Sequence, residues 1–381
     1  MRTIGVDMRV LGTGRRSGVE EYTEQVVSHM IPRAPDVQWK LFYSGRTPLQ
    51  RRSWMEYSNV RVIDTGWSNR MLWLATRLRG RPYLDHMVGG ADVFFFPHFL
   101  LGALSQNCRR VMTWHDLSYE RMPHLLSLHR RVWHQFQMRP RFQAALADKI
   151  IAVSQATAQD LQDVYALESE RIAVVSSGVD PDLRRVSEVE IQRWRTAQGI
   201  DAPFVLALGT REPRKNLPAL IAAWDRARRD PALRNLHLVL AGPVGWMERE
   251  ILQAIGAAHA PHEVHILEHV SREDRATVLS AASALVYPSL MEGFGFPPLE
   301  AMACGTPVIA SATSSLFETV GDAGLLVDPY RIDSLAGALS ALVTDAGLRS
   351  RLIARGFDRV SLFTWERAAR ATLSEIFSVL E

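Results

Sequence analysis

Two carboxylates frame the segment of this chain that is best suited to chemistry. Glu292 and Glu300 have seven residues between them, including two glycines and a Pro-Pro step. The run 284–288 is typical of a short buried strand, and the run 299–303 of the start of a helix. We therefore expect Glu292 on a loop at the C-terminal end of a strand and Glu300 in the first turn of a helix. Ligands of open α/β sheets bind at this edge.

The backbone between the two carboxylates favours a bound anion. Gly293 and Gly295 allow backbone N–H groups to come close to a ligand, and the N-terminus of the following helix attracts phosphate. The alternative is a purely structural segment. Strand–loop–helix units with Gly and Pro are common, and the helix dipole alone stabilises a glutamate in the first turn.

Three cations occupy a second loop that should face the same edge. Arg211, Arg214 and Lys215 lie in the run 209–216, directly after the predicted strand 204–208. Fixed positive charges at such a place stabilise a diphosphate as negative charge builds on it. The alternative for each arginine is an ordinary solvated loop charge. Nearly all the basic residues of this chain are arginines, and lysine is rare. A lysine at position 215 therefore suggests a need for a compact ammonium group there.

The elements that must position these residues alternate along the chain in two series. Two βα series joined near residue 180 predict an α/β protein with two doubly wound, Rossmann-like domains and a cleft between them. A length of 381 residues also favours two domains. The expected strands are residues 4–10, 39–43, 60–63, 93–96, 110–113, 149–153 and 172–175, then 204–208, 236–241, 264–266, 284–287 and 307–310. The expected helices include 129–146 and a terminal helix over 364–379.

Composition and charge exclude several classes of protein. A hydrophobic content of 47% excludes a disordered chain. The first strand begins at once, with no signal peptide before it, and the most apolar patch, 93–104, is too short to span a bilayer. We therefore expect a cytoplasmic protein. The excess of basic residues is modest, and no aromatic–basic recognition motif accompanies it, which argues against a nucleic-acid partner.

The positive charge is concentrated in the first half. Residues 1–180 carry 23 Lys and Arg against 17 Asp and Glu, and the remainder carries 21 against 24. Segment 70–79 mixes arginines with Trp73 and leucines. This mixture suits either the surface of an anionic membrane or an ordinary solvated helix face.

No metal or redox site is expected. Cys108 and Cys304 lie far apart and predict neither a disulfide framework nor a metal site. Asp180 and Asp182 spell a D-x-D pattern that can hold a metal ion, but Pro181 between them favours an interdomain turn. No His/Cys cluster has the spacing of metal ligands. We expect a reaction with neither a metal ion nor a cofactor, apart from a co-substrate.

The residues from Glu292 to Glu300, E-G-F-G-F-P-P-L-E, resemble the glutamate-pair signature of family 4 glycosyltransferases, which are retaining enzymes of the GT-B fold. The loop 209–216 resembles the diphosphate-binding loop of that family, and Lys215 matches the family lysine. Many members place an arginine where this chain has Thr210, so Arg211 and Arg214 are alternative replacements. The resemblance covers nearly the whole chain and is strongest over residues 204–329.

The resemblance implies a role for each candidate residue. His115 and Glu292 would be catalytic, the histidine beside the donor sugar and phosphate and the glutamate at the sugar hydroxyls. Glu300 would accept hydrogen bonds from the ribose, and the backbone near His269 and Val270 would read the base. The residues expected at the donor diphosphate are Gly18, Arg211, Arg214, Lys215, Gly293, Phe294, Gly295 and Phe296. For His115, the alternative is a buried, hydrogen-bonded structural role.

The resemblance also implies a division of labour. Residues 1–182, with the terminal helix 364–381 crossing back to them, would form the acceptor-side domain. Residues 183–363 would form the nucleotide-sugar-binding domain. The expected reaction is retaining, metal-independent transfer of a hexose from a nucleoside diphosphate sugar to a glycan or lipid-linked acceptor in cell-surface polysaccharide biosynthesis.

The local motifs G-T-x-E-P-R-K-N and H-D-L resemble those of bacterial mannosyl- and rhamnosyl-type transferases. This resemblance makes GDP-mannose the first expected donor. A lipid-linked acceptor would suit peripheral contact between the basic first half and the cytoplasmic face of the inner membrane. Two alternatives stand beside this function. One is a sugar-nucleotide epimerase of similar fold, and the other is a catalytically silent subunit that binds a nucleotide sugar.

Overall fold

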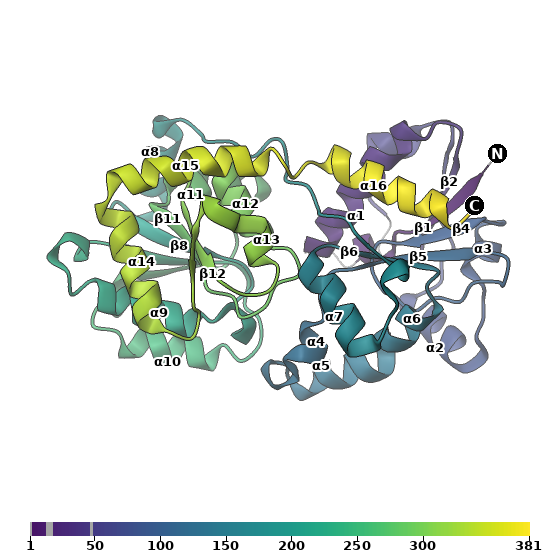
Figure 1. Cartoon of the computed structure of the whole chain (residues 1–381), viewed down its shortest axis with the longest axis horizontal. Coiled ribbons are helices and arrows are strands. Elements are labelled where there is room, and N and C mark those ends of the chain that lie inside the picture. Colours follow the sequence, from purple (N-terminus) through teal and green to yellow (C-terminus); the bar gives the residue numbers. More distant parts are fainter. Residues whose placement is uncertain (1, 13–17, 46–48) are drawn as a thin grey trace. The chain divides into compact units, whose positions relative to one another are not determined.

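The chain folds into two compact units. The computed structural model describes residues 2–12, 18–45 and 49–381, so the residues directly before the candidate Gly18 lie outside the described residues. The first unit comprises residues 1–120, 128–178 and 365–381, and the second comprises residues 121–127 and 179–364 (Figure 1). The sequence analysis placed the change of domain at 182/183, whereas the units divide between Gly178 and Val179.

A parallel sheet of seven strands forms the centre of the first unit. Its order is β3-β2-β1-β4-β5-β6-β7. β1 therefore has β2 on one side and β4 on the other, which makes the β1/β4 boundary the switch point of this sheet. β4 is buried along its whole length, as expected for a strand covered on both faces. The strands are β1 Thr3–Asp7, β2 Gln38–Tyr43, β3 Val60–Asp64, β4 Val93–Phe96, β5 Arg109–Trp114, β6 Lys149–Ala152 and β7 Ile172–Val174.

The helices of the first unit include one that differs from the prediction. A continuous helix was predicted over 129–146. The chain instead forms α5, the π-helical turn η5 and α6, with Arg139 at φ +48° before Pro140. A proline disfavours the right-handed helical region for the residue before it, which explains the break. The helices are α1 Gly18–Met30, α2 Asn69–Arg79, α3 Leu84–Met87, α4 Ser118–Arg121, α5 Leu128–Val132, η5 Trp133–Met138, α6 Pro140–Leu146 and α7 Gln155–Tyr165.

The last helix, α16 (Trp365–Ser378), belongs to the first unit. It packs along α1, as Figure 1 shows for the yellow helix, so the predicted return of the terminal helix is confirmed. Its buried face repeats at helical spacing, with Trp365 edge-on to Tyr22 of α1 at 6.1 Å between ring centres. The buried residues of this face are Trp365, Ala368, Ala369, Thr372, Leu373 and Ile376.

The second unit is built on a parallel sheet of six strands. Its order is β10-β9-β8-β11-β12-β13. β8 has β9 on one side and β11 on the other, so the loops that leave β8 and β11 begin side by side at the C-terminal edge. The strands are β8 Phe204–Leu208, β9 His237–Ala241, β10 Val264–Leu267, β11 Ala284–Tyr287, β12 Val308–Ser311 and β13 Leu325–Val327.

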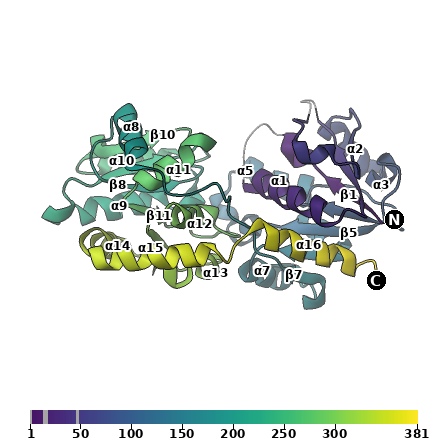
Figure 2. The same cartoon turned by 90° about the horizontal axis from the view of Figure 1, so that it is seen from above.

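Helices cover both faces of this second sheet. α9 and α14 pack together over one face and bury Trp224 and Leu339. On the other side α12 lies beside α15, which both Figure 1 and Figure 2 show, and Gly356 of α15 meets Met302 there. The helices are α8 Glu188–Gln198, α9 Leu217–Ala227, α10 Arg249–Ala257, α11 Arg272–Ala281, α12 Phe296–Ala303, α13 Leu316–Val320, α14 Ile332–Thr344 and α15 Ala346–Val360.

Short 3-10 turns connect many of these elements. Several begin with a proline, whose missing N–H is not needed at a helix start. They are η1 Arg9–Gly12, η2 Ile31–Arg33, η3 Ser53–Glu56, η4 Pro123–Leu125, η6 Ser169–Arg171, η7 Pro213–Lys215, η8 Pro231–Leu233, η9 Pro261–Glu263 and η10 Gly321–Ala323.

Candidate active site

Two glycines bring backbone close together at the C-terminal edge of the second sheet. Gly209 directly follows β8, and Gly242 directly follows β9. A Cβ on Gly242 would stand 2.1 Å from the carbonyl oxygen of Gly209, so no larger residue fits there. The backbone at this edge is therefore uncovered by side chains, which suits the close approach of a ligand.

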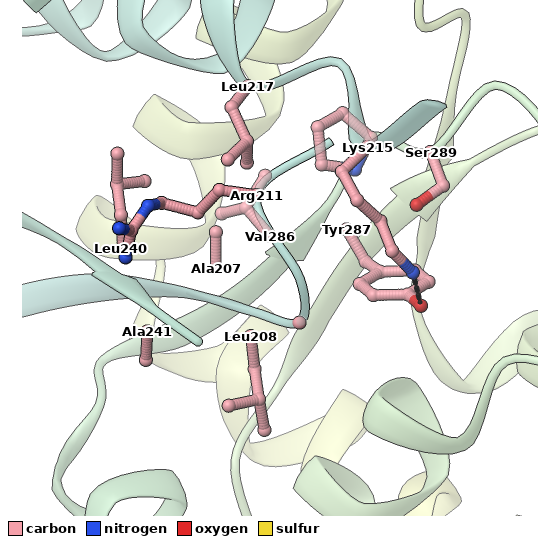
Figure 3. Close-up of a pocket in the computed structure, with 12 residues that line it drawn as sticks. Ala207, Leu208, Arg211, Lys215, Leu217, Leu240, Ala241, Val286, Tyr287 and Ser289 are labelled. Atoms are coloured by element: carbon pink, nitrogen blue, oxygen red, sulfur yellow. Dashed lines mark hydrogen bonds between the residues drawn. The ribbon is translucent and has the colours of Figure 1, made fainter. Parts of the chain in front are cut away.

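A pocket opens beside these glycines. Lys215 and Tyr287 lie on one side of it and the ends of β8 and β9 on the other (Figure 3). It occupies the β8/β11 switch point, where open α/β sheets bind their ligands. The lining residues are Ala207, Leu208, Gly209, Arg211, Lys215, Leu217, Leu240, Ala241, Val286, Tyr287, Pro288 and Ser289.

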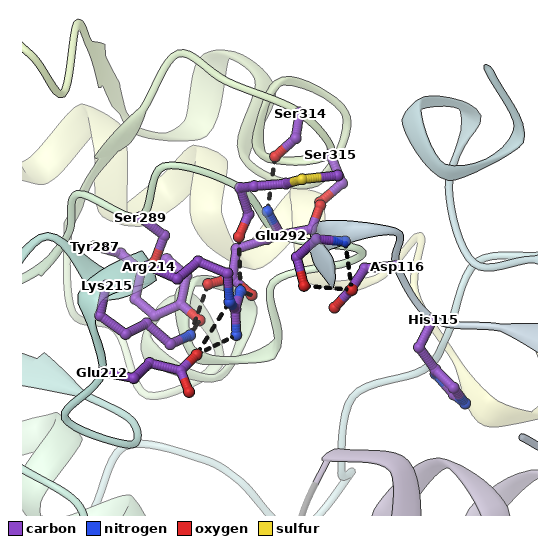
Figure 4. Close-up of polar contacts among 12 residues, drawn as sticks. His115, Asp116, Glu212, Arg214, Lys215, Tyr287, Ser289, Glu292, Ser314 and Ser315 are labelled. Carbon is purple, nitrogen blue, oxygen red and sulfur yellow. Dashed lines mark hydrogen bonds and ion pairs between the residues drawn. The ribbon is translucent and has the colours of Figure 1, made fainter. Parts of the chain in front are cut away.

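Lys215 and Glu292 form a buried ion pair at this pocket. The Lys215 Nζ lies 2.6 Å from Glu292 Oε1 and donates a second hydrogen bond, 2.5 Å long, to the Tyr287 hydroxyl (Figure 4). An ammonium has three N–H donors. The described residues take two of them, which leaves one N–H for a ligand.

Arg214 holds the other oxygen of the same carboxylate. Its Nη1 lies 2.8 Å from Glu292 Oε2, and its Nη2 lies 2.7 Å from Glu212 Oε1. Nη1 also donates to the Met291 carbonyl at 2.6 Å. Arg214 thus joins the loop after β8 to the loop after β11 and fixes the position of Glu292.

The electrostatics of the pair favour the charged form of Glu292. Burial raises the pKa of Glu292, but the neighbouring Arg214 and Lys215 outweigh it and bring the pKa to about 2. Burial lowers the pKa of Lys215, and the charge of Glu292 opposes that shift. A carboxylate with so low a pKa is a weak base, so Glu292 is suited to orienting a ligand by accepting hydrogen bonds rather than to removing a proton.

Two serines hold the backbone of Glu292. Its N–H donates to Ser314 Oγ at 2.9 Å, and Ser315 Oγ donates to its carbonyl at 2.9 Å. The side chain and the main chain of Glu292 are therefore both restrained, and the carboxylate is preorganised rather than free to turn.

Arg211 does not join this cluster. Its side chain is 2% exposed, and it pairs with Glu248 at 2.8 Å and donates to the Gly242 carbonyl at 2.7 Å. The sequence left Arg211 and Arg214 as alternatives. The structure places Arg214 beside Lys215 and Glu292, and gives Arg211 the task of holding the loop after β9.

The residues after Glu292 turn the chain into α12. Gly295 has φ +94° and precedes the first residue of that helix, Phe296. A Cβ on Gly295 would also stand 2.7 Å from Leu316 Cδ2. The ring of Phe294 packs between Phe296 and Phe363, with ring centres 5.1 and 5.7 Å away. Phe294 is buried by these contacts, whereas Phe296, the first residue of α12, is half-buried.

Glu300 lies in α12, one turn later than predicted. The helix begins at Phe296, so Glu300 is in the second turn rather than the first, because the chain becomes helical directly after Gly295. Its Oε2 accepts two hydrogen bonds from Arg275 of α11, at 2.8 and 2.5 Å. The two glutamates therefore have separate cationic partners.

The two candidates for the base lie beyond β10. His269 is exposed and Val270 is half-buried, in the segment between β10 and α11. They belong to the same edge of the sheet as the pocket, since both follow the C-terminal end of a parallel strand. Their proposed contact with a base stays a prediction.

His115 follows the C-terminal end of β5 in the first unit. Its Nε2 lies 2.8 Å from the Pro97 carbonyl oxygen, which can only accept, so Nε2 carries the proton and Nδ1 the lone pair. The Tyr22 ring meets the imidazole edge-on at 4.9 Å. Burial lowers the pKa of His115 and keeps it neutral near pH 7. Its Nδ1 is therefore suited to accept a hydrogen bond from a hydroxyl group.

The remaining first-unit candidates lie at element ends. Gly18 is the exposed first residue of α1. Asp116 accepts hydrogen bonds from the backbone and hydroxyl of Ser118, at 2.9 and 2.7 Å, and so caps the turn after His115.

Sequence reasoning missed three partners of the candidate residues. Glu212, Tyr287 and Arg275 contact Arg214, Lys215 and Glu300 respectively. Glu212 and Tyr287 border motifs that were recognised, so their positions carried a signal. Arg275 sits in an ordinary polar helix, α11, and nothing in its local sequence distinguishes it.

Within residues 2–12, 18–45 and 49–381, no group of three or more His, Cys, Asp or Glu side chains is arranged to hold a metal ion. In the same residues no helix is long and apolar enough to cross a membrane.

Comparisons with known proteins agree with this architecture. Residues 4–183 match the model described as Glycosyltransferase Family 4, and residues 189–359 match the one described as Glycosyl transferases group 1. The chain is 30% identical over 299 residues to the O-antigen chain mannosyltransferase B of Escherichia coli, which covers 77% of this chain and 74% of that protein.

Two solved structures share the fold. HepE of Anabaena, in complex with UDP and glucose, superposes with a TM-score of 0.72 at 19% identity over 100% of both chains. WaaG, a glycosyltransferase involved in lipopolysaccharide biosynthesis, superposes with a TM-score of 0.68 at 18% identity over 97% of this chain and 98% of that one.

The predicted GT-B architecture of two Rossmann-like domains is thus confirmed by the sheets of the chain and by its structural neighbours. From the two matched domains and the shared sequence it follows that the chain belongs to glycosyltransferase family 4 and is a glycosyltransferase of the hexosyltransferase type.

Proposed function

We propose that this enzyme transfers mannose from GDP-mannose to a glycan or lipid-linked saccharide, with retention of configuration and without a metal ion, in the synthesis of a cell-surface polysaccharide. The likeness to an O-antigen mannosyltransferase supports the sugar and the pathway class. The observation that carries the proposal is the Arg214–Lys215–Glu292 cluster at the switch point of the second sheet.

The cluster supplies the two things that a nucleotide-sugar donor needs. The third N–H of Lys215 and the guanidinium of Arg214 offer fixed positive charge to the leaving diphosphate, which is the role a metal ion plays in other enzymes. The Glu292 carboxylate accepts hydrogen bonds from the sugar hydroxyls and orients the anomeric carbon. Two cations hold this carboxylate in place, so it needs no rearrangement when charge develops on the phosphate.

The low pKa of Glu292, about 2, bears on the course of the reaction. A covalent route to retention needs a carboxylate nucleophile at the anomeric carbon. Glu292 is tied to two cations and is a poor nucleophile. We therefore favour attack on the same face from which the diphosphate leaves, with an oxygen of that phosphate taking the proton of the acceptor hydroxyl.

The first unit supplies the acceptor side in this proposal. The unprotonated Nδ1 of His115 is suited to receive a hydrogen bond from a substrate hydroxyl. α2 exposes Met71, Leu74 and Leu78 among arginines, a composition suited to the surface of an anionic membrane where a lipid-linked acceptor resides. Flotation with phosphatidylglycerol vesicles at low salt is expected to carry the protein upward, and protein that stays at the bottom would refute the membrane contact.

The donor is tested by thermal shift across GDP-, UDP-, dTDP- and ADP-sugars. We expect GDP-mannose to raise the melting temperature most. Lys215→Met should weaken the binding of GDP-mannose by about 10- to 100-fold, which is the contribution of one charge-assisted hydrogen bond. Lys149→Met is the matched control, because it removes a lysine of the first unit and should leave donor affinity unchanged.

The reaction itself is tested with GDP-mannose and a saccharide acceptor. Proton NMR of the product should show the anomeric configuration of the donor, and EDTA should leave the rate unchanged. An inverted product, or a rate that EDTA abolishes, would refute the mechanism. Release of an altered sugar nucleotide without an acceptor would instead identify an epimerase.

A further inference from the structure

The first unit contains a second cavity that the transfer reaction does not use. It measures about 470 Å³ and lies between α2, the segment 101–108 and α6. Arg110, at the start of β5, lines it, whereas His115 follows the end of the same strand. Five residues at about 3.3 Å each place the two about 16 Å apart, at opposite edges of the sheet. The cavity is therefore distinct from the substrate edge.

Three arginines line this cavity without a carboxylate partner. They are Arg77, Arg110 and Arg139, and no described residue forms an ion pair with the guanidinium of any of them. Arg110 is 5% exposed, and its guanidinium donates only to neutral acceptors, Gln143 Oε1 at 3.2 Å and the Gly102 carbonyl at 2.9 Å. Burial lowers the pKa of Arg110 to about 10, so it stays charged near pH 7.

The acidic groups nearby are already engaged. Asp148 lines the cavity, but it pairs with Arg109 at 3.1 Å and accepts the backbone N–H of Arg110 at 2.7 Å. Asp85 accepts from the backbone and hydroxyl of Ser105, at 2.9 and 2.5 Å. Three arginines thus line the cavity against one carboxylate, Asp148, so positive charge is in excess there.

One polar atom of the cavity lining, and one in the residue that accepts from Arg110, have no hydrogen-bond partner among the described residues. Thr76, a lining residue, is about nine-tenths buried, and its Oγ1 is unsatisfied. The Nε2 of Gln143 is also unsatisfied, since Arg110 occupies the other end of that amide. Buried donors without partners cost free energy unless a ligand satisfies them. Thr76 Oγ1 is therefore the atom that a ligand in the cavity can satisfy, whereas Gln143 does not line it.

An exposed apolar rim borders the same cavity. Phe142 and Leu146 line it and are 42% and 47% exposed. Leu78, next to Arg77 on α2, is 73% exposed, and the guanidinium of Arg139 lies over the Phe142 ring at 4.4 Å. The cavity has hydrogen-bond donors and positive charge inside and apolar side chains at its mouth. This arrangement matches a molecule with an anionic head and a hydrocarbon tail.

We propose that this cavity binds the phosphate headgroup of an anionic phospholipid, with the first acyl segments lying against Phe142 and Leu146. The site rests on the membrane contact proposed above and turns it from a diffuse attraction into a defined lipid site. It is not an acceptor site, because it opens at the edge of the sheet opposite His115.

The test uses the full-length protein and a lipid that is monomeric in water, dihexanoyl phosphatidylglycerol, with binding measured by calorimetry. Arg77→Gln should weaken binding at least tenfold through loss of a charge-assisted hydrogen bond. Arg79→Gln is the matched control, since it removes the same charge from the same helix outside the cavity, and should change binding less than twofold. Equal losses in the two variants would overturn the site in favour of general surface charge.

Thr76→Val gives a second, independent reading because it keeps the shape and removes the hydroxyl. The site predicts weaker lipid binding. Unchanged binding together with a higher melting temperature would show an empty cavity and overturn the proposal. Inorganic phosphate that binds as tightly as the lipid would overturn the lipid assignment. If vesicle flotation fails but the monomeric lipid binds, the membrane contact is refuted and the cavity site is not. A separate assay, transfer to a soluble acceptor, reports on the glycosyltransferase activity.

Discussion

Glu292 carries its negative charge inside the second unit because two cations are fixed against it. Lys215 and Arg214 each take one carboxylate oxygen, and two serines hold the backbone. A buried charge is stable only when it is paired in this way. The arrangement makes the carboxylate at once a structural element of two loops and the group best placed to meet a sugar.

Glu292→Gln keeps the size of the side chain and removes its charge. Lys215 is then left buried without a counter-charge, which should lower the free energy of unfolding by about 3–5 kcal/mol. Transfer should slow by about 10- to 100-fold as hydrogen bonds to the sugar weaken. Urea denaturation and kcat measure the two effects. Glu250→Gln, at an exposed position of α10, serves as the control, and an unchanged denaturation midpoint in Glu292→Gln would contradict the pairing.

The same carboxylate gives stability a defined dependence on pH. Its pKa is about 2 in the folded chain against 4.5 for an unperturbed glutamate. Its contribution is therefore complete above pH 4.5 and lost as the pH falls towards 2, because the unfolded chain takes up the proton first. The 2.5-unit difference corresponds to about 3 kcal/mol. The stability gap between wild type and Glu292→Gln should narrow over this range, and a gap that stays constant would argue against the shift.

Single residues show where sequence reasoning reaches its limit. Lys215 and Glu292 were both singled out on loops that follow predicted strands and should face the same edge, and the structure joins them. Arg211 and Arg214 could not be told apart, since the choice depends on Glu248 and Gly242, which come from another loop. Arg275 could not be identified as a site residue from the sequence for the same reason. Its significance comes from a contact between two helices, not from its neighbours in sequence.

At the scale of elements, the turn between Glu292 and α12 depends on one backbone conformation. Gly295→Ala forces a side chain into φ +94° and within 2.7 Å of Leu316. We expect a loss of about 1–3 kcal/mol of stability and weaker donor binding.

Gly256→Ala is the matched control for that turn. Gly256 lies in α10, where a Cβ meets nothing within 4 Å, so alanine should stabilise the chain by about 0.4–1 kcal/mol. Chemical denaturation of both variants measures the contrast. Stabilisation of both by similar amounts would show that the turn tolerates a side chain.

The elements were predictable where the hydrophobic pattern was long enough. The strands on either side of the two switch points are buried apolar runs, and the sequence analysis found them. β13, only three residues long, was not predicted because so short a run shows no period. The helix predicted over 129–146 has continuous apolar spacing, but Pro140 acts on the residue before it and breaks the helix at Arg139.

At the scale of the whole molecule, the two units have separate cores and different charge. The donor-site candidates around Lys215 all belong to the second unit, and the arginine-lined cavity belongs to the first. The two proposed ligands, a nucleotide and an anionic lipid, would therefore bind in different units.

Hydrogen exchange can test this separation. GDP should slow amide exchange in peptides covering residues 209–216 and 288–300, because the bound diphosphate contacts the backbone and loops there. Peptides covering α2 should exchange at the same rate with and without GDP. Lys215→Met should raise the GDP concentration needed for this protection by about 10- to 100-fold. Protection of α2 alone would show that GDP binds the first unit and would contradict the proposed donor site in the second unit.

The packing of α16 on α1 has a consequence for how the chain is made. α1 ends at Met30, and its partner helix begins at Trp365. A ribosome that adds about 5–20 residues per second needs roughly 17–67 s to synthesise the chain between them. During that time the surface of α1 that α16 covers, including the edge of Tyr22 that meets Trp365, lacks this partner. The second unit is then complete before the first, so the N-terminal half is the part of the nascent chain that most depends on protection by a chaperone.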